Sequence, residues 1–230
     1  MLVKMILLLQ NQFENIQRRS NMADKETELA LYVQVDNPNF TPTTGSEVWK
    51  QYESKLESKT GIRVRVYEGV EGPNKCIQTI KIKAGKIGGL ESSDEYSCAI
   101  PEGFAEGFIK GASSVQYKRR DTYTSNKVVL KLSRGDEVEN HDAPQLTIEA
   151  DRFITEDGYL PWLKIDVELD GLLAWVKSTY GKDKVNGYHI ELDKILPCKV
   201  LKVISSTTTD PEEKKILDDL WDNHFKKKLI

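Results

Sequence analysis

The sequence predicts an α+β protein dominated by an antiparallel sheet. Three observations support this class. About eight short segments alternate polar and apolar residues, the period of two that is typical of strands. Helical patterns flank and interrupt them. On several of the strand segments, the polar face carries like charges two residues apart. We therefore expect a sheet with one apolar face and one face that is unusually rich in charge.

The elements are expected in the following order. Strand patterns cover residues 26–33, 61–69, 76–85, 94–101, 115–124, 126–135, 146–153 and 162–170. The segment 46–61 predicts an amphipathic helix, because Val48, Trp49, Tyr52 and Leu56 share helical spacing and Gly61 follows. Further helices are expected at 102–112 and 171–181. A last helix is expected after Asp210, with Pro211 in its first turn and Glu213 completing a capping box.

The like charges form ladders whose sign depends on the strand. Acids occupy the first strand and the last two, and bases occupy strands between them. The acids are Glu26, Glu28, Glu149, Asp151, Asp166 and Glu168; the bases are Arg63, Arg65, Lys81, Lys83, Lys118 and Arg120. On an open sheet such neighbours repel slightly and gain little from folding.

Closure of the sheet into a barrel would make the first and last strands neighbours. The acids would then gather on one wall and the bases on the rest. Burying like charges costs several kcal/mol per uncompensated ion, so such an interior suits a bound polyanion together with a divalent cation. Hard oxygen ligands select Mg²⁺ or Mn²⁺. The alternative left open by the alternation is a charged face that is simply solvated.

Composition limits the function further. The chain has 230 residues and a net charge of −3, which argues against general nucleic-acid binding. Three widely spaced cysteines without a CxxC pair predict a reducing, cytoplasmic setting rather than a disulfide framework. The apolar start is too short to span a membrane. We expect residues 1–21 to be a translated leader or an amphipathic helix, and residues 22–230 to form a single domain.

Several short motifs, taken in order, resemble those of the CYTH superfamily, the triphosphate tunnel metalloenzymes. "ETELALYV" resembles the opening ExExK strand, "RVRV" the RxR strand and "QTIKIK" the TIK strand. "EYSCAIP", "YKRRD", "TIEADRF" and "LKIDVELDG" resemble the EYEIP, KxR, WEID-F and AEIEL strands. The likeness spans roughly residues 24–170. It implies a closed eight-stranded antiparallel β-tunnel with charged residues pointing inward and helices at the periphery.

The resemblance also implies roles for the charged residues. Glu26, Glu28 and Glu168 would bind the metal with support from Asp166, while Glu95, Glu149 and Asp151 would orient bases or hold a second cation. Phosphate oxygens would be bound by Arg63, Arg65, Lys81, Lys118 and Arg120, since an arginine fork binds phosphate in bidentate fashion. Lys83 competes with Lys81 for the motif position. Among these residues, Glu28, Glu168 and Lys118 are the predicted catalytic set.

Two positions depart from the family pattern. Ala30 stands where the opening motif has its lysine, and Ser97 stands where the second acid of EYE would be. The loss of a positive contact can cost orders of magnitude in rate. Lys131 or Lys83 is expected to compensate from a neighbouring strand.

The function implied by the resemblance is metal-dependent hydrolysis of inorganic triphosphate or a nucleoside triphosphate. Adenylate cyclase-type activity is the alternative within the family. The non-enzymatic alternative is a tunnel that binds a nucleotide or polyphosphate without catalysis. The departures at Ala30 and Ser97 favour it. The expected partner is a triphosphate-bearing small molecule. Trp221 and Phe225 are expected in the core or at a homodimer contact.

Overall fold

The computed structural model describes residues 24–41, 46–55, 60–87, 90–125, 128–140, 142–181, 185–190 and 192–226. The predicted leader at residues 1–21 lies outside this part of the chain. None of the described helices has the length and apolar character needed to cross a membrane.

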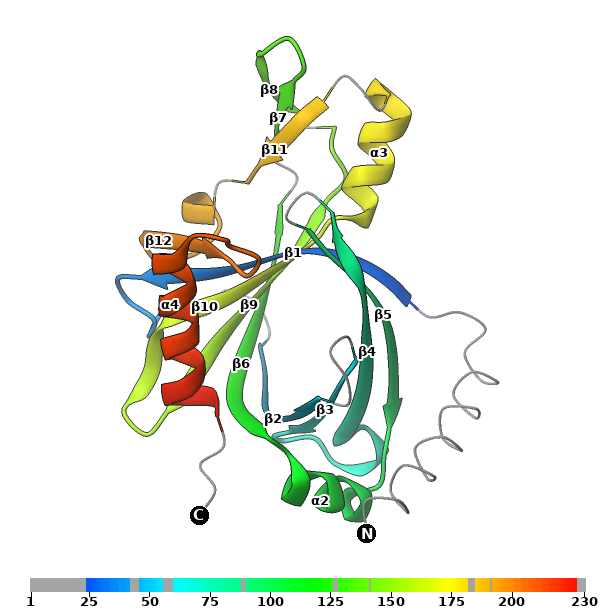
Figure 1. The fold of residues 1–230 in the computed structure, drawn as a ribbon, viewed down its shortest axis with the longest axis vertical. Helices are drawn as coiled ribbons and strands as arrows, with labels where there is room; N and C mark the ends of the chain where they lie inside the picture. The colour runs from blue at the N-terminus through cyan, green and yellow to red at the C-terminus, as the bar shows by residue number, and fades with distance from the viewer. Residues whose placement is uncertain are drawn as a thin grey trace.

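Eight strands of the described chain form a closed antiparallel barrel (Figure 1), which confirms the predicted fold class. The sheet order is β10-β9-β6-β2-β3-β4-β5-β1, and β1 also pairs with β10 to close it. In this seam Glu28 lies opposite Glu168 and Ala30 opposite Asp166, so the first and last barrel strands are neighbours as predicted. The strands are β1 (Asp24–Val35), β2 (Ser46–Lys55), β3 (Thr60–Tyr67), β4 (Cys76–Ile87), β5 (Leu90–Ala99), β6 (Ser114–Ser125), β9 (Leu146–Thr155) and β10 (Gly158–Glu168).

The membership of the barrel differs from the sequence prediction at two places. The helix predicted over 46–61 is wrong, because residues 46–55 form strand β2 between β3 and β6. The strand predicted over 126–135 exists as β7 (Val128–Leu132), but it lies outside the barrel. The helix was predicted wrongly because of Trp49. This apolar residue lies on the inner, otherwise polar face of β2 and interrupts the alternation of polar and apolar residues.

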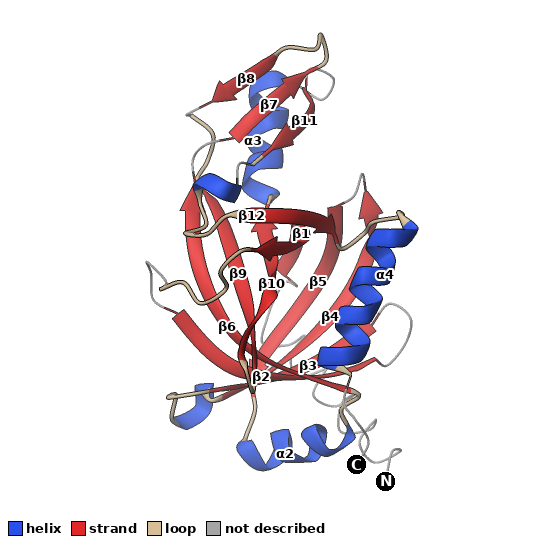
Figure 2. Ribbon diagram, turned by 90° about the vertical axis from the view of Figure 1, so that its left-hand side faces the viewer, coloured by secondary structure: helices blue, strands red, loops and turns tan. Residues whose placement is uncertain are grey.

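A second, three-stranded sheet stands beyond one end of the barrel (Figures 1 and 2). Its order is β11-β7-β8, with β8 at Glu137–Asn140 and β11 at Val185–His189, neither of which was among the predicted strands. Helix α3 (Asp170–Tyr180) lies beside it, as the sequence predicts. Strand β12 (Val200–Ser205) pairs with β1 and extends the main sheet past the barrel.

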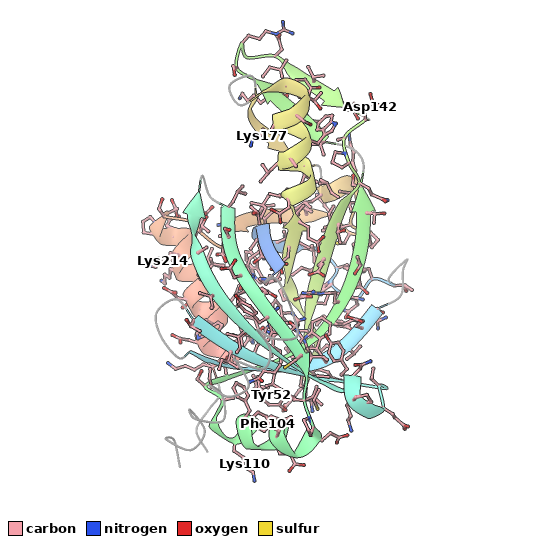
Figure 3. All side chains as sticks on the ribbon, turned by 90° about the vertical axis from the view of Figure 1, so that its right-hand side faces the viewer. Tyr52, Phe104, Lys110, Asp142, Lys177 and Lys214 are labelled. Atoms are coloured by element: carbon pink, nitrogen blue, oxygen red, sulfur yellow. The ribbon has the colours of Figure 1, made fainter. Side chains whose placement is uncertain are left out.

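The barrel is apolar outside, and its cavity is lined by charged and polar side chains. Outward-facing Ile62, Val64 and Ile80 pack against Ala105 and Phe108 of α2 (Glu102–Gly111). Figure 3 shows Tyr52 and Phe104 at this contact and Lys110 pointing away from the barrel. A larger outer cluster unites β1, β9 and β10 with α3, through residues such as Val33, Ile148, Ile165 and Leu172. Because helices and connecting segments cover the apolar faces, the polar faces are left to line the interior.

Helix α4 (Pro211–Leu220) and the π-helical turn that follows it, Trp221–Phe225, cover an apolar stretch of the inner surface. Leu220 and Phe225 pack on Phe153, Trp162 and Ile204, which places the last aromatic residues in a core, one of the two expected locations. Figure 1 shows α4 beside β9, β10 and β12.

The start of α4 is capped largely as predicted. Asp210 accepts hydrogen bonds from the backbone N–H groups of Glu212 and Glu213 at 2.9 Å. The predicted capping box is incomplete, because Glu213 accepts from the Thr208 hydroxyl and the Asp210 N–H donates to Thr208. Two short 3₁₀ turns, Gly72–Asn74 and Leu192–Lys194, complete the described elements.

Candidate functional site: an ion-paired tunnel cavity

The barrel encloses a cavity of about 230 Å³ whose lining side chains are all charged or polar. Six carboxylates and six cationic groups of the described chain line it, together with two neutral side chains, so the lining has no formal net charge. The acids are Glu26, Glu28, Glu95, Glu149, Asp151 and Asp166; the bases are Arg63, Arg65, Lys81, Lys118, Arg120 and Lys164; the neutral residues are Gln51 and Ser97.

Three carboxylates meet at one ammonium group on the wall formed by β1, β4 and β5. Lys81 Nζ lies 2.7 Å from Glu28 Oε1, 2.9 Å from Glu95 Oε1 and 3.4 Å from Glu26 Oε2. Arg63 Nη2 pairs with the second oxygen of Glu95 at 2.9 Å. Burial alone would raise the pKa of Glu95, but Arg63 and Lys81 outweigh it and lower that pKa. This acidic wall is therefore held together by its own basic residues.

Asp151 organises the opposite wall. Its carboxylate receives two hydrogen bonds from Arg120, at 2.7 and 3.1 Å, and one from Lys118 at 3.3 Å. Arg120 also pairs with Glu149. Burial alone would raise the pKa of Asp151, but Arg120 and Lys118 hold it far below its usual range. Burial lowers the pKa of Lys118 to about 8. An anion that enters the cavity would favour the charged form of Lys118 and so oppose the effect of burial on its pKa.

Arg65 differs from the other cations of the cavity. No carboxylate of the described chain lies within 4.0 Å of its guanidinium, which donates to Gln51 Oε1 at 3.0 Å. It lies over the Trp49 ring at 4.9 Å, and Arg120 lies over the same ring at 5.1 Å. Burial lowers the pKa of Arg65, and the like charges of Arg63 and Arg120 add to the effect. Arg65 is thus a partly buried cation that lacks an anionic partner among the described residues.

A lysine on the closing strand lies next to the position of Ala30. Ala30 is opposite Asp166 in the register, and both oxygens of Asp166 accept hydrogen bonds from Lys164 Nζ, at 2.7 and 2.5 Å. Burial alone would lower the pKa of Lys164, but Asp166 and Glu28 raise it above its usual range. Lys164 thus supplies an ammonium group to the part of the cavity where the family motif would place one at position 30.

The structure brings most of the predicted site residues together and leaves three outside the lining. Lys83 is exposed beside Glu91, with Nζ 3.6 Å from Oε2. Lys131 is exposed on β7, in the separate sheet, so it does not reach the cavity from a neighbouring barrel strand as predicted. Glu168 faces Glu28 in the register but is exposed at the end of β10. Between Lys81 and Lys83, the structure places Lys81 in the cavity.

Three groups that shape the cavity were not predicted from the sequence. Gln51 and Trp49 were assigned to a helix, so their inner positions on β2 were not foreseen. Lys164 lies within the strand predicted over 162–170 but was given no role. A test of residues 46–55 for a period of two would have found the first pair, since Glu47, Trp49, Gln51 and Glu53 alternate with Val48, Lys50 and Tyr52.

The described carboxylates do not form a ready metal site. Among the described residues, no three histidine, cysteine, aspartate or glutamate side chains form a group that could hold a metal ion. Glu26, Glu28 and Glu95 have suitable hard oxygen donors, but they surround the ammonium group of Lys81. In this arrangement the residues do not fit a resident divalent cation.

Glu26 makes the stability of the fold sensitive to pH. Burial, with the nearby charges of Glu28 and Glu95, raises its pKa from 4.5 to about 7. Between these values the folded state keeps a proton that the unfolded state has lost, so stability falls as pH rises. We expect Glu26→Gln to reduce this fall by about 1–2 kcal/mol, measured by urea unfolding at pH 5 and pH 7.5.

The control for this pH dependence is Glu102→Gln, at the exposed ion pair with Lys75. It should leave the difference between the two pH values unchanged. If Glu26→Gln retained the whole pH dependence of the unmodified protein, the raised pKa of Glu26 would be contradicted.

The fold and the cavity together define a closed antiparallel β-tunnel with an ion-paired interior, the architecture implied by the resemblance to the CYTH superfamily. No model of a known protein family and no curated protein matches the chain. A solved structure from Hippeastrum, assigned as an adenylyl cyclase and described as having a dominant triphosphatase activity, is 11% identical with a TM-score of 0.38. That match covers 70% of this chain and 90% of the Hippeastrum chain.

Two archaeal structures are similarly distant. A protein of Pyrococcus horikoshii OT3 is 19% identical, with a TM-score of 0.37 and coverage of 88% of this chain and 96% of its own. A conserved hypothetical protein of Pyrococcus furiosus is 15% identical, with a TM-score of 0.37 and coverage of 69% and 94%. Structures this distant give no information about the chemistry of this chain, so the proposed function rests on the tunnel itself.

Proposed function

We propose that the tunnel binds a triphosphate and hydrolyses it. Arg65 carries this proposal, because a partly buried guanidinium without a carboxylate partner among the described residues would gain from an anion that offsets the cost of its burial. Arg63, Arg120 and Lys118 line the same cavity. Guanidinium forks bind phosphate oxygens in bidentate fashion, and several adjacent phosphates would engage several of these groups at once.

The size and lining of the cavity favour inorganic triphosphate over a nucleoside triphosphate. Sites for drug-sized ligands usually measure about 300–1,000 Å³, and this cavity measures about 230 Å³. Its lining residues are all charged or polar, and the inner-facing ring of Trp49 is buried beneath Arg65 and Arg120, so the described residues leave no aromatic surface open for a base to stack on. For the same reason, no lining group favours cyclisation of a nucleotide.

Hydrolysis needs a group that accepts a proton from the attacking water, and general bases work best when their pKa lies near the operating pH. Glu26 lines the cavity and has a pKa raised to about 7 by burial and by Glu28 and Glu95. We therefore assign the base role to Glu26, while Arg65 and Arg120 orient the phosphates.

A divalent cation, Mg²⁺ or Mn²⁺, remains part of the proposal. It would neutralise oxygens of the bound phosphate rather than reside among Glu26, Glu28 and Glu95, because the Lys81 ammonium occupies that position. A non-catalytic polyphosphate-binding tunnel is the second candidate function. It is favoured by the pairing of the cavity carboxylates with lysines and arginines, which leaves few of them available for catalysis.

Assays with tripolyphosphate and with ATP, each with Mg²⁺ or Mn²⁺, test the proposal. We expect phosphate release from tripolyphosphate, slower release from ATP and no cyclic nucleotide. Glu26→Gln should lower kcat more than it raises KM. Tight binding without phosphate release would favour the non-catalytic candidate, and neither binding nor release would contradict both.

A further inference from the structure

Arg65 is held in place by side chains of the neighbouring strand. It lies on β3, but its Nε donates to Gln51 Oε1 at 3.0 Å and its guanidinium lies 4.9 Å from the centre of the Trp49 ring. Both of these partners are on β2. Gln51 in turn donates its amide N–H to Glu53, which directs the amide oxygen toward Arg65. The position of Arg65 is therefore set by β2 and not by a carboxylate of the described chain.

The Trp49 ring is shared by two arginines from different strands. Strand β2 lies between β3 and β6 in the sheet (Figure 1), and Arg120 of β6 lies 5.1 Å from the centre of the same ring. The positive charge of Arg120 contributes to the lowered pKa of Arg65, so the two guanidinium groups repel each other. A tryptophan face attracts cations more strongly than other aromatic rings do, and this attraction offsets part of the repulsion.

The face of Trp49, and not its N–H group, makes these contacts. Trp49 is fully buried, and its Nε1 has no hydrogen-bond partner among the described residues. A buried tryptophan usually pairs its N–H group, because an unpaired buried donor is unfavourable. The ring face is therefore the part of this side chain that contributes to the tunnel, through the two arginines that lie over it.

We propose that Trp49 is a positioning residue, whose ring holds Arg65 and Arg120 in the arrangement in which both guanidinium groups bind one phosphate ligand. Both arginines line the same cavity. A ligand that meets them already ordered loses less conformational entropy on binding. The holding of the two arginines by the ring needs no ligand, whereas its effect on affinity rests on the proposed triphosphate binding.

The first test follows the Nε–H signals of Arg65 and Arg120 by nuclear magnetic resonance of the full chain, without any phosphate compound. An aromatic ring shifts the resonances of nearby protons, so Trp49→Leu should move both signals. Trp162→Leu is the matched control, because it is the same change at a buried tryptophan in the apolar cluster under α4, and no cation of the described chain lies over that ring. It should leave both signals in place. Unmoved signals in Trp49→Leu would overturn the proposal.

The second test is calorimetric titration with tripolyphosphate. Trp49→Leu should weaken binding about tenfold, whereas Trp49→Phe, which keeps a ring and removes the unpaired N–H group, should recover most of that loss. In an Arg65→Ala background the same Trp49→Leu change should weaken binding by only about threefold or less, because one of the two groups that the ring holds is gone. An equal loss in both backgrounds would overturn the proposal, since Trp49 would then act through the general integrity of the barrel.

The two tests separate this proposal from the proposed function. If the unmodified protein does not bind tripolyphosphate, the proposed function is contradicted, and with it the effect of Trp49 on affinity. The resonance experiment still decides whether the ring holds the two arginines, because it uses no ligand. If Trp49→Leu does not fold, as judged by circular dichroism, Trp49→Met provides the same comparison, since it also removes the ring.

Discussion

Replacing Arg65 with alanine is expected to weaken tripolyphosphate binding at least tenfold. The guanidinium is a partly buried cation of the cavity that lacks a carboxylate partner among the described residues, so its full charge is available to a ligand. Hydrogen bonds to charged groups contribute about 1.5–3 kcal/mol each, which corresponds to roughly a tenfold to hundredfold change in Kd. Isothermal titration calorimetry at a fixed salt concentration measures the change.

Lys131→Ala is the matched control for Arg65→Ala. Lys131 was also predicted to bind substrate, but it is exposed on β7 outside the barrel, and its removal should leave Kd within twofold. Arg65→Lys should fall between the two variants, since lysine keeps the charge but loses the planar contact with Trp49. Equal affinities for Arg65→Ala and Lys131→Ala would contradict the tunnel as the phosphate site.

Asp151→Asn is expected to cause the largest loss of stability in the tunnel. The Asp151 side chain is 1% exposed and compensates two buried cations, Lys118 and Arg120. Removing one partner of a buried ion pair typically costs about 3–5 kcal/mol, because the other charge is left uncompensated. Urea unfolding should show this loss, whereas Asp136→Asn, at an exposed ion pair with Arg134, should change stability by less than about 0.5 kcal/mol.

The same variant should respond more strongly to anions. With Asp151 neutral, the cavity gains one net positive charge, so tripolyphosphate should raise the melting temperature of Asp151→Asn more than that of the unmodified protein. An unchanged stability in Asp151→Asn would contradict the role of this carboxylate as the organiser of its wall.

The alternation of charges along single strands was the most informative feature of the sequence. Successive strand residues point to opposite faces, so Glu26 with Glu28, or Arg63 with Arg65, could be assigned to one face without a structure. Closure between β1 and β10 followed from the sign of the ladders, since it alone unites the acids of the first and last strands. Strand β2 was not predicted, because Trp49 is an apolar residue on the charged face and interrupts the alternation.

The pairing of charges across the tunnel was not predictable in this way. Alternation gives the face of a residue but not its height in the barrel, which depends on the stagger between strands. Lys81 was therefore expected on phosphate, although its nearest partners prove to be Glu28 and Glu95. Similarly, alternation over 126–135 predicted a strand at Lys131 but could not tell which sheet that strand would join.

The seam between β1 and β10 joins segments far apart along the chain, as the hydrogen bond from Thr27 N–H to Asp170, 143 positions later, illustrates. Contacts of such long range form slowly, because the entropy of closing a long loop is lost before they contribute. Until the seam closes, Glu26 and Glu28 on β1 have not met Asp166 on β10, and the cavity does not yet exist. Ligand binding to this tunnel thus reports that the seam has closed as well as that the site functions.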